Sequence, residues 1–206
     1  MMELKERFTQ TCFPFTQDQN VIDFLWQEIE KKYSEKGRHY HNLEHLDNMF
    51  VELDAVKDQI SSFSTISFSV FYHDVIYDAS SKTNEEKSAD FALKRLQQLD
   101  VNKADISEIH HQILATKSHQ KSENKDTNYL LDVDLSILGK DLETYLEYTK
   151  KIRKEYSIYP DLLYKPGRKK VLKHFLELEN IFKTNVFKEK YESRARENIL
   201  FEIESL

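Results

Sequence analysis

Glycine and proline are so scarce in this chain that they leave few places where the backbone can turn sharply. Only three Gly and three Pro occur among 206 residues. Tight β-hairpins depend on residues such as Gly, Asn and Pro at their turn positions, whereas helix interiors exclude Gly and Pro. Leu, Glu and Lys, which favour helices, are abundant. The composition therefore predicts an all-α protein, folded as a compact helical bundle.

The length of the chain and its uniform composition predict one domain. A chain of 206 residues can bury a core of its own, and no repeat, low-complexity tract or long linker divides it. We expect a single domain over 1–206, with a core at about 20–140 and a C-terminal helical extension at about 140–206. Apolar spacing and helix breakers predict helices over 17–35, 42–57, 62–78, 83–99, 103–117, 127–138, 140–157, 167–184 and 187–204.

Two segments are expected to be irregular. They are 117–126, which is interpreted as an exposed loop, and 159–167. The expected buried face of the first helix consists of Val21, Phe24, Leu25, Ile29 and Tyr33.

Charge and cysteine content narrow the partners and the compartment. The formal net charge is -6, with acidic and basic residues interspersed, so we expect no nucleic-acid partner. A single cysteine, Cys12, excludes an internal disulfide and a cysteine-based zinc site, and it suits a reducing compartment. The sequence shows neither a signal-peptide pattern nor an apolar run near the length of a membrane span. We expect a cytoplasmic protein without a membrane partner.

The dipeptide His73-Asp74 is the first candidate for chemistry. It lies near the end of SFSTISFSVFYHDVIYD (62–78), which carries no charged residue before Asp74. An unpaired charge buried there costs several kcal/mol, whereas imidazole and carboxylate groups commonly share a metal ion. His41 and His45 are four residues apart and share a helix face, so either can reach the same centre.

A fourth ligand is expected from TNYLLDVDLSILG (127–139), which contains Asp132 and Asp134. On a helix these two carboxylates lie about 200° apart and cannot face one site. The neighbours of Asp134 are more apolar, which places it on the side predicted to be buried and makes it the preferred ligand. His110 and His111 are a candidate for a second metal site, although a surface helix position is the favoured interpretation.

These residues stand in an order that resembles the HD superfamily of metal-dependent phosphohydrolases. The closer resemblance, to bacterial predicted metal-dependent HD phosphohydrolases of unassigned substrate, covers nearly the whole chain and is carried by RHYHNLEHLDNM, FYHDVIYD, NEEKSADFA, DVDLSILG, IRKEY, PGRKKVL and RARENILFE. The resemblance implies a helical HD-domain fold and a divalent metal ion, for which Mn, Fe, Co, Ni, Zn and Mg are all candidates. The implied ligands are His45, His73, Asp74 and Asp134.

Two better-studied groups of the superfamily suggest individual roles. The segment YHNLEHLDNM resembles the YHNxxHAxDV motif of cyclic-nucleotide phosphodiesterases, which implies that His41 is a general acid and His45 a metal ligand. It departs from that motif at Leu46 and Asn48. The same enzymes have Asp-Leu-Ser at their last ligand, which corresponds to Asp134. The guanosine-tetraphosphate hydrolases show HDxxED, of which HDVIYD keeps the last Asp but replaces the Glu by Tyr.

The predicted activity is hydrolysis of a phosphate ester or anhydride in a small phosphorylated substrate, with a nucleotide as the preferred class. Asp78 or Glu85 would accept the proton of water, and His41 would protonate the leaving oxygen. The alternative is a non-catalytic, metal-stabilised helical module that senses a nucleotide or binds a partner. Cationic donors suited to phosphate are expected among Arg38, Lys117, His119, Arg153, Arg168 and Arg196.

Overall fold

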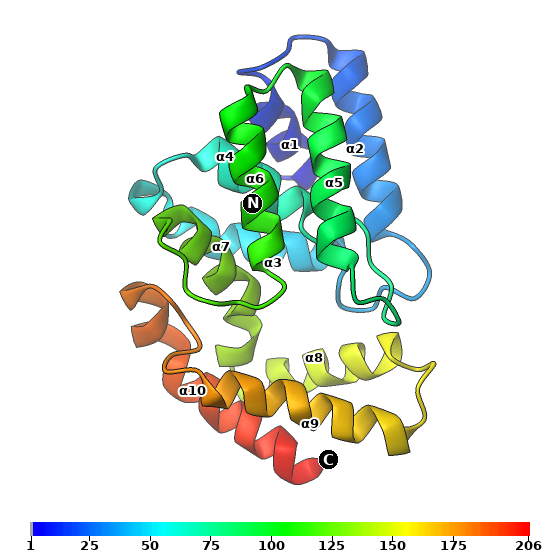
Figure 1. Cartoon of the computed structure of the whole chain (residues 1–206), viewed down its shortest axis with the longest axis vertical. Coiled ribbons are helices and arrows are strands. Elements are labelled where there is room, and N and C mark those ends of the chain that lie inside the picture. The colour runs from blue at the N-terminus through cyan, green and yellow to red at the C-terminus, as the bar shows by residue number, and fades with distance from the viewer. Residues whose placement is uncertain (1) are drawn as a thin grey trace.

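The computed structural model describes residues 2–206, and this part of the chain is helical without any strand (Figure 1). The prediction of an all-α bundle is confirmed. The helices are α1 (Leu4–Cys12), α2 (Gln19–Tyr33), α3 (Leu43–Asp54), α4 (Phe63–Tyr72), α5 (Asn84–Leu96), α6 (Lys103–Ala115), α7 (Lys125–Leu135), α8 (Leu142–Glu155), α9 (Asp161–Glu177) and α10 (Asn185–Ser205), with short 3₁₀ helices η1 (Lys57–Gln59), η2 (Gln97–Leu99) and η3 (Ser136–Gly139).

The helices form two layers, with α1–α6 in one and α8–α10 in the other (Figure 1). The centre of the larger layer is α4, which contacts α1, α3, α5, α6 and α7. Its residues from Thr65 to Tyr72 are all buried, as the absence of charge in this segment requires. The smaller layer is joined to the rest through η3, which packs on α8 and α10. One cluster of buried hydrophobic residues runs through both layers, from Leu4 to Ile199.

The N-terminal helix α1 was not predicted, and it belongs to the core. Phe8 is fully buried and its ring makes edge contacts with Phe68 and Phe71 at centroid distances of 6.3 and 5.1 Å. The hydrophobic cluster thus includes residues before position 20, where the sequence analysis placed the start of the core. The helix was missed because its apolar residues are only three, Leu4, Phe8 and Cys12, set four apart in a polar segment.

The prediction that the central helix continues to residue 78 is also wrong. The helix α4 ends at Tyr72, and His73 and Asp74 lie in the turn that follows. Arg38 explains the end of the helix, because its guanidinium donates to the carbonyl oxygens of Asp74 and Val75 at 2.7 and 3.0 Å. Ser88 likewise binds the backbone of Ile76. Side chains thus take over the hydrogen bonds that a longer helix would have made.

Two further differences concern the faces and limits of helices. Phe24 is 51% exposed, and the buried face of α2 passes through Ile22 and Trp26 instead. The segment 159–167 is not wholly irregular, because α9 begins at Asp161 and includes Pro166. Pro166 is the sixth residue of this helix, beyond the first turn, so it removes one backbone hydrogen bond from the helix interior. Within residues 2–206 we find no helix with the length and apolarity that crossing a membrane demands.

Candidate metal centre

The four predicted metal ligands are brought together by three helices. His45 lies in the first turn of α3, where the Asn42 side chain caps the helix and accepts a hydrogen bond from the His45 amide. His73 immediately follows α4, and Asp74 comes next. Asp134 lies near the end of α7. The contacts of α4 with α3 and α7 therefore place the four side chains at one point in the fold.

The ligand atoms of His45, His73 and Asp74 are close enough to share one ion, and Asp134 adjoins both histidines. His45 Nε2 lies 3.2 Å from His73 Nε2 and 3.3 Å from Asp134 Oδ1. His73 Nε2 lies 3.2 Å from Asp74 Oδ2, and single ligand atoms of His45, His73 and Asp74 all lie within 4.8 Å of one another. Both histidines are buried. Two imidazoles and two carboxylates are a donor set that fits a divalent transition-metal ion.

Neighbouring groups orient these ligands. His73 Nδ1 is 2.9 Å from the carbonyl oxygen of Val70, to which it donates, so that its Nε2 lone pair faces the centre. His119 Nε2 lies 2.9 Å from Asp134 Oδ2, which leaves Oδ1 of the same carboxylate directed at the histidines. His119, for which the sequence predicted a substrate contact, is therefore a hydrogen-bond partner of the predicted ligand Asp134.

The electrostatics of the cluster favour a cation. Burial lowers the pKa of His45, whose imidazole is thus in the neutral form that binds metals. Burial also opposes protonation of His73, but the neighbouring carboxylates of Asp74 and Asp134 outweigh it and raise the pKa of His73 to about 9. The contact with His73 holds the pKa of Asp74 below the ordinary range despite its burial, and hydrogen bonds with His119 and His45 do the same for Asp134. The two carboxylates thus hold a positive charge between the histidines, which a metal ion can supply in place of the proton.

Asp132 has a different role from Asp134. The two carboxylates face different places, as predicted, but the prediction that Asp134 is the more buried of the two is wrong. Asp132 is the more buried of the two, with no exposed surface, and burial raises its pKa to about 6. Its carboxylate accepts hydrogen bonds from the amides of Lys183 and Thr184 at 2.6 and 2.8 Å and from the Thr184 hydroxyl. Asp132 therefore fixes the start of α10, whereas Asp134 is partly open because it faces a cavity.

A carboxylate that the sequence analysis missed holds His41 in place. Glu155, at the end of α8, has a fully buried side chain, and its Oε1 accepts the backbone amides of residues 39, 40 and 41 at 2.7–2.9 Å. Its Oε2 lies 2.7 Å from His41 Nδ1 and accepts a hydrogen bond from the Tyr77 hydroxyl at 2.9 Å. The only sequence signal was the motif IRKEY, whose charges resemble those of an ordinary surface helix.

These contacts direct the other nitrogen of His41 toward the metal centre. His41 Nε2 lies 3.9 Å from Asp74 Oδ2, and the Tyr77 ring stacks on the imidazole at a centroid distance of 4.3 Å. Burial disfavours the charged imidazole, but the hydrogen bond that His41 donates to Glu155 and the charge of Asp74 prevail and raise the pKa of His41. His41 Nε2 therefore faces the centre, in surroundings that favour the protonated imidazole.

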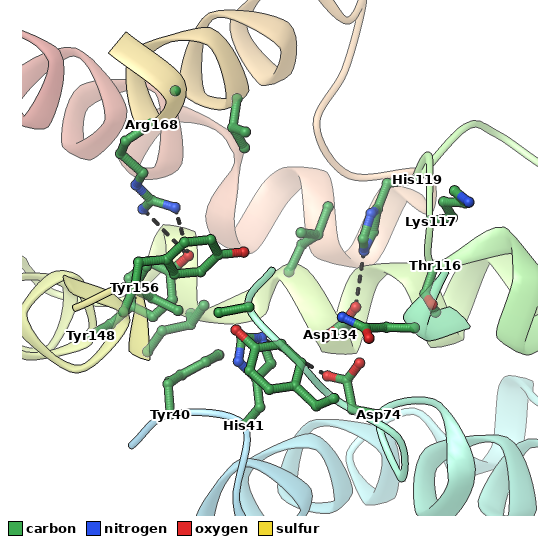
Figure 2. Close-up of a pocket in the computed structure, with 18 of the residues that line it drawn as sticks. Tyr40, His41, Asp74, Thr116, Lys117, His119, Asp134, Tyr148, Tyr156 and Arg168 are labelled. Carbon is green, nitrogen blue, oxygen red and sulfur yellow. Dashed lines mark hydrogen bonds and ion pairs between the residues drawn. The ribbon is translucent and has the colours of Figure 1, made fainter. Parts of the chain in front are cut away.

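The centre lies at the polar end of a cavity of about 720 Å³ between the two layers. Figure 2 shows His41, Asp74 and Asp134 at this end, and Arg168 with Tyr148 at the other. Arg168 is paired with Glu202 at 2.7 Å. The far wall is aromatic and apolar, and its principal members are Tyr148, Ile152, Tyr156, Tyr159, Leu163, Tyr164, Val171 and Phe175.

The remaining predicted site residues divide between the cavity and other places. Glu85 and Lys117 line the cavity, and Lys117 also donates to the Lys82 carbonyl and to Glu86. Asp78 is exposed and holds the turn that follows it, accepting hydrogen bonds from the amide and the hydroxyl of Ser80 at 2.8 and 2.7 Å. Asp78 lies outside α4, because that helix ends at Tyr72.

Three of the predicted phosphate-binding arginines have structural partners and do not line the cavity. Arg38 is buried against backbone carbonyls, as described above. Arg153 pairs with Asp161 at 2.8 Å, and Arg196 pairs with Glu192 at 2.8 Å. His110 and His111 were considered for a second metal ion. They line a separate cavity, next to α5 and α6.

Comparison of the chain with protein-family models, with curated proteins and with solved structures gives no match. The function is therefore inferred from the residues of the site and from their geometry.

Proposed function

We propose that this protein is a metal-dependent phosphohydrolase of the HD type that acts on a phosphate ester or anhydride of a small molecule. The observation that carries the proposal is the meeting of His45, His73, Asp74 and Asp134 at the polar end of a cavity that can hold such a molecule. These four side chains would hold one divalent ion. A divalent cation supplies Lewis acidity, which lowers the pKa of water and polarises a phosphoryl oxygen.

Proton transfer is assigned to His41 and Glu85. In the hydrolysis, water adds to phosphorus and the bond from phosphorus to the leaving oxygen breaks. His41, held through Nδ1 by Glu155, gives its Nε2 proton to the leaving oxygen. Glu85 accepts the proton of water, because it lines the cavity whereas Asp78 is exposed and engaged in its own turn.

A nucleotide is the substrate class that the cavity supports best. The flat rings of nucleobases bind well against aromatic side chains. Six tyrosines line the cavity: Tyr40, Tyr77, Tyr148, Tyr156, Tyr159 and Tyr164. A nucleotide substrate and the single buried cysteine, Cys12, support a cytoplasmic location.

Metal analysis and phosphate release test this function together. Elemental analysis of the purified protein should find a transition metal, and nucleotides should release phosphate when Mn²⁺, Fe²⁺, Co²⁺, Ni²⁺, Zn²⁺ or Mg²⁺ is restored after chelation. The variant His73→Ala should lose both the metal and the activity. His39→Ala is the matched control, because His39 has an exposed side chain in the same part of the fold. Activity that survives metal removal would refute the proposal.

The second candidate is a metal-stabilised module that senses a nucleotide without hydrolysing it. The observation that favours it is the exposed position of Asp78, which leaves Glu85 as the only predicted base in the cavity. The variants His41→Ala and Glu85→Gln separate the two functions. The enzyme loses turnover in both variants while its metal content stays the same, whereas a sensor shows no turnover even as wild type and still binds the nucleotide.

A further inference from the structure

The helix α9 carries a concentration of positive charge that is unlike the rest of this acidic chain. The net charge of the whole chain is -6, yet residues 162–176 contain no Asp or Glu. The basic residues of this segment are Lys165, Arg168, Lys169, Lys170, Lys173 and His174. Such a segment creates a local positive potential that attracts anions.

The helical period divides α9 into two neighbouring faces. Tyr164, Arg168, Val171 and Phe175 recur at spacings of three and four and line the cavity of the candidate metal centre. Lys169, Lys170, Lys173 and His174 recur in the same way on the next face. They line a second hollow of about 920 Å³, here called the α9 groove, whose wall also includes the acidic Glu177 at the end of the helix.

The α9 groove adjoins the candidate metal centre directly. Four residues line both hollows: Lys117, His119, Val171 and Phe175. His119 also lies 2.9 Å from the carboxylate of the predicted ligand Asp134. Its backbone has φ 51°, a left-handed conformation that is uncommon outside glycine and that directs this loop side chain between the two hollows. A group bound in the groove therefore lies next to a group bound at the centre.

Within residues 2–206, three of the four lysines that line the groove have no partner, whereas Lys117 is paired with Glu86. In the part of the protein that the structure describes, the ammonium groups of Lys169, Lys170 and Lys173 make neither a hydrogen bond nor an ion pair, and the last two residues are exposed. Like charges at i and i+4, such as Lys169 and Lys173, repel one another on a helix. An anion in the groove would relieve this repulsion.

The cavity itself offers few cations for a second phosphate. Apart from its histidines, its basic side chains are Lys117 and Arg168, and these are paired with Glu86 and Glu202. A metal ion at the centre suits one phosphate group. The unpaired cations available to a further phosphate on the same molecule lie beyond His119, in the α9 groove.

We propose, on the basis of the proposed function, that the α9 groove binds a second phosphate group of the substrate. The substrate is then a nucleotide with at least two phosphates, one at the metal centre and one held by Lys169, Lys170 and Lys173. The groove gives the enzyme its preference for such a nucleotide over a nucleoside monophosphate.

The test compares a variant of the groove with a control of equal charge. The triple variant K169Q/K170Q/K173Q removes the cations, and glutamine keeps a helix propensity close to that of lysine. The control K31Q/K94Q/K103Q changes three exposed lysines that line neither hollow. Phosphate release is measured with Mn²⁺ from AMP, ADP and adenosine 3′,5′-bisphosphate.

Wild type should have a higher kcat/KM for ADP or for the bisphosphate than for AMP. In the groove variant, kcat/KM for ADP or the bisphosphate should be about tenfold lower, chiefly through a higher KM. The reason is that three exposed charge contacts are lost, each of which changes affinity a few-fold. Its kcat/KM for AMP should change by less than about twofold, and the control should resemble wild type. Equal losses for all three nucleotides, or no loss for any, would overturn the proposal.

Binding gives a readout that does not need turnover. Failure of wild type to release phosphate from any nucleotide contradicts the proposed function, not the groove. Calorimetry with ADP and the bisphosphate then decides: weaker binding by the groove variant than by the control supports the inference, and equal Kd values overturn it. A groove variant that loses affinity for a single-stranded oligonucleotide but not for either small nucleotide would assign the groove to nucleic acid and also overturn it.

Discussion

Replacing Glu155 by glutamine should destabilise the fold by an amount that depends on pH. The carboxylate accepts five hydrogen bonds, three from backbone amides and one each from His41 and Tyr77. Burial by itself raises the pKa of Glu155, but these partners lower it from 4.5 to about 2. A tenfold change in an equilibrium corresponds to about 1.4 kcal/mol, so the carboxylate contributes about 3 kcal/mol to the free energy of unfolding at pH 7.

The sign of the pH dependence follows from the lowered pKa. The contribution of Glu155 is complete above pH 4.5, the value for the unfolded chain, and it is lost as the pH falls toward about 2. Urea unfolding of metal-free wild type and Glu155→Gln should therefore differ by about 3 kcal/mol at pH 7 and by about half of this near pH 3.

Glu147→Gln is the control for this experiment, because it removes an exposed carboxylate from the same helix α8. Its effect should stay within about 0.5 kcal/mol at every pH. If Glu155→Gln costs no more than this control, or if its cost is the same at pH 3 and pH 7, the assigned role of the carboxylate is refuted.

Three substitutions test the packing around the site by urea unfolding or by Tm. Asp132→Ala should lower the free energy of unfolding by about 2–4 kcal/mol, because it leaves buried amides at the start of α10 without an acceptor, while metal content stays unchanged in elemental analysis. Gly139→Ala should lower Tm sharply, since the added Cβ would lie 2.5 Å from Tyr191 Cβ. Gly167→Ala, inside α9 with open space around it, should raise stability by about 0.5–1 kcal/mol. Opposite outcomes for the two glycines would contradict the packing described.

The helical fold and the cluster of candidate metal ligands could be predicted from local features of the sequence. The scarcity of Gly and Pro and the spacing of apolar residues are properties of short segments, so they identify most helices. The position of His73-Asp74 at the end of an uncharged segment was also a local signal. The distances among His45, His73 and Asp134 agree with the cluster that this signal predicted.

Residues whose role depends on distant backbone could not be predicted. Glu155 binds amides more than 110 positions earlier in the chain, and backbone amides have no sequence signature. Arg38 and Asp132 were misjudged for the same reason, because one binds carbonyls after α4 and the other binds amides before α10.

The sequence by itself determined that the chain is helical and which histidines and aspartates are suited to a metal ion, because helix propensity and ligand chemistry belong to single residues and their near neighbours. Only the tertiary structure decided how these residues are used. The position of α8 and α9 opposite the larger layer forms the cavity between the layers, brings Glu155 to His41 and sets the unpaired lysines of α9 beside the candidate metal centre. These are contacts between segments far apart in the chain, and their energies appear only when the layers pack together.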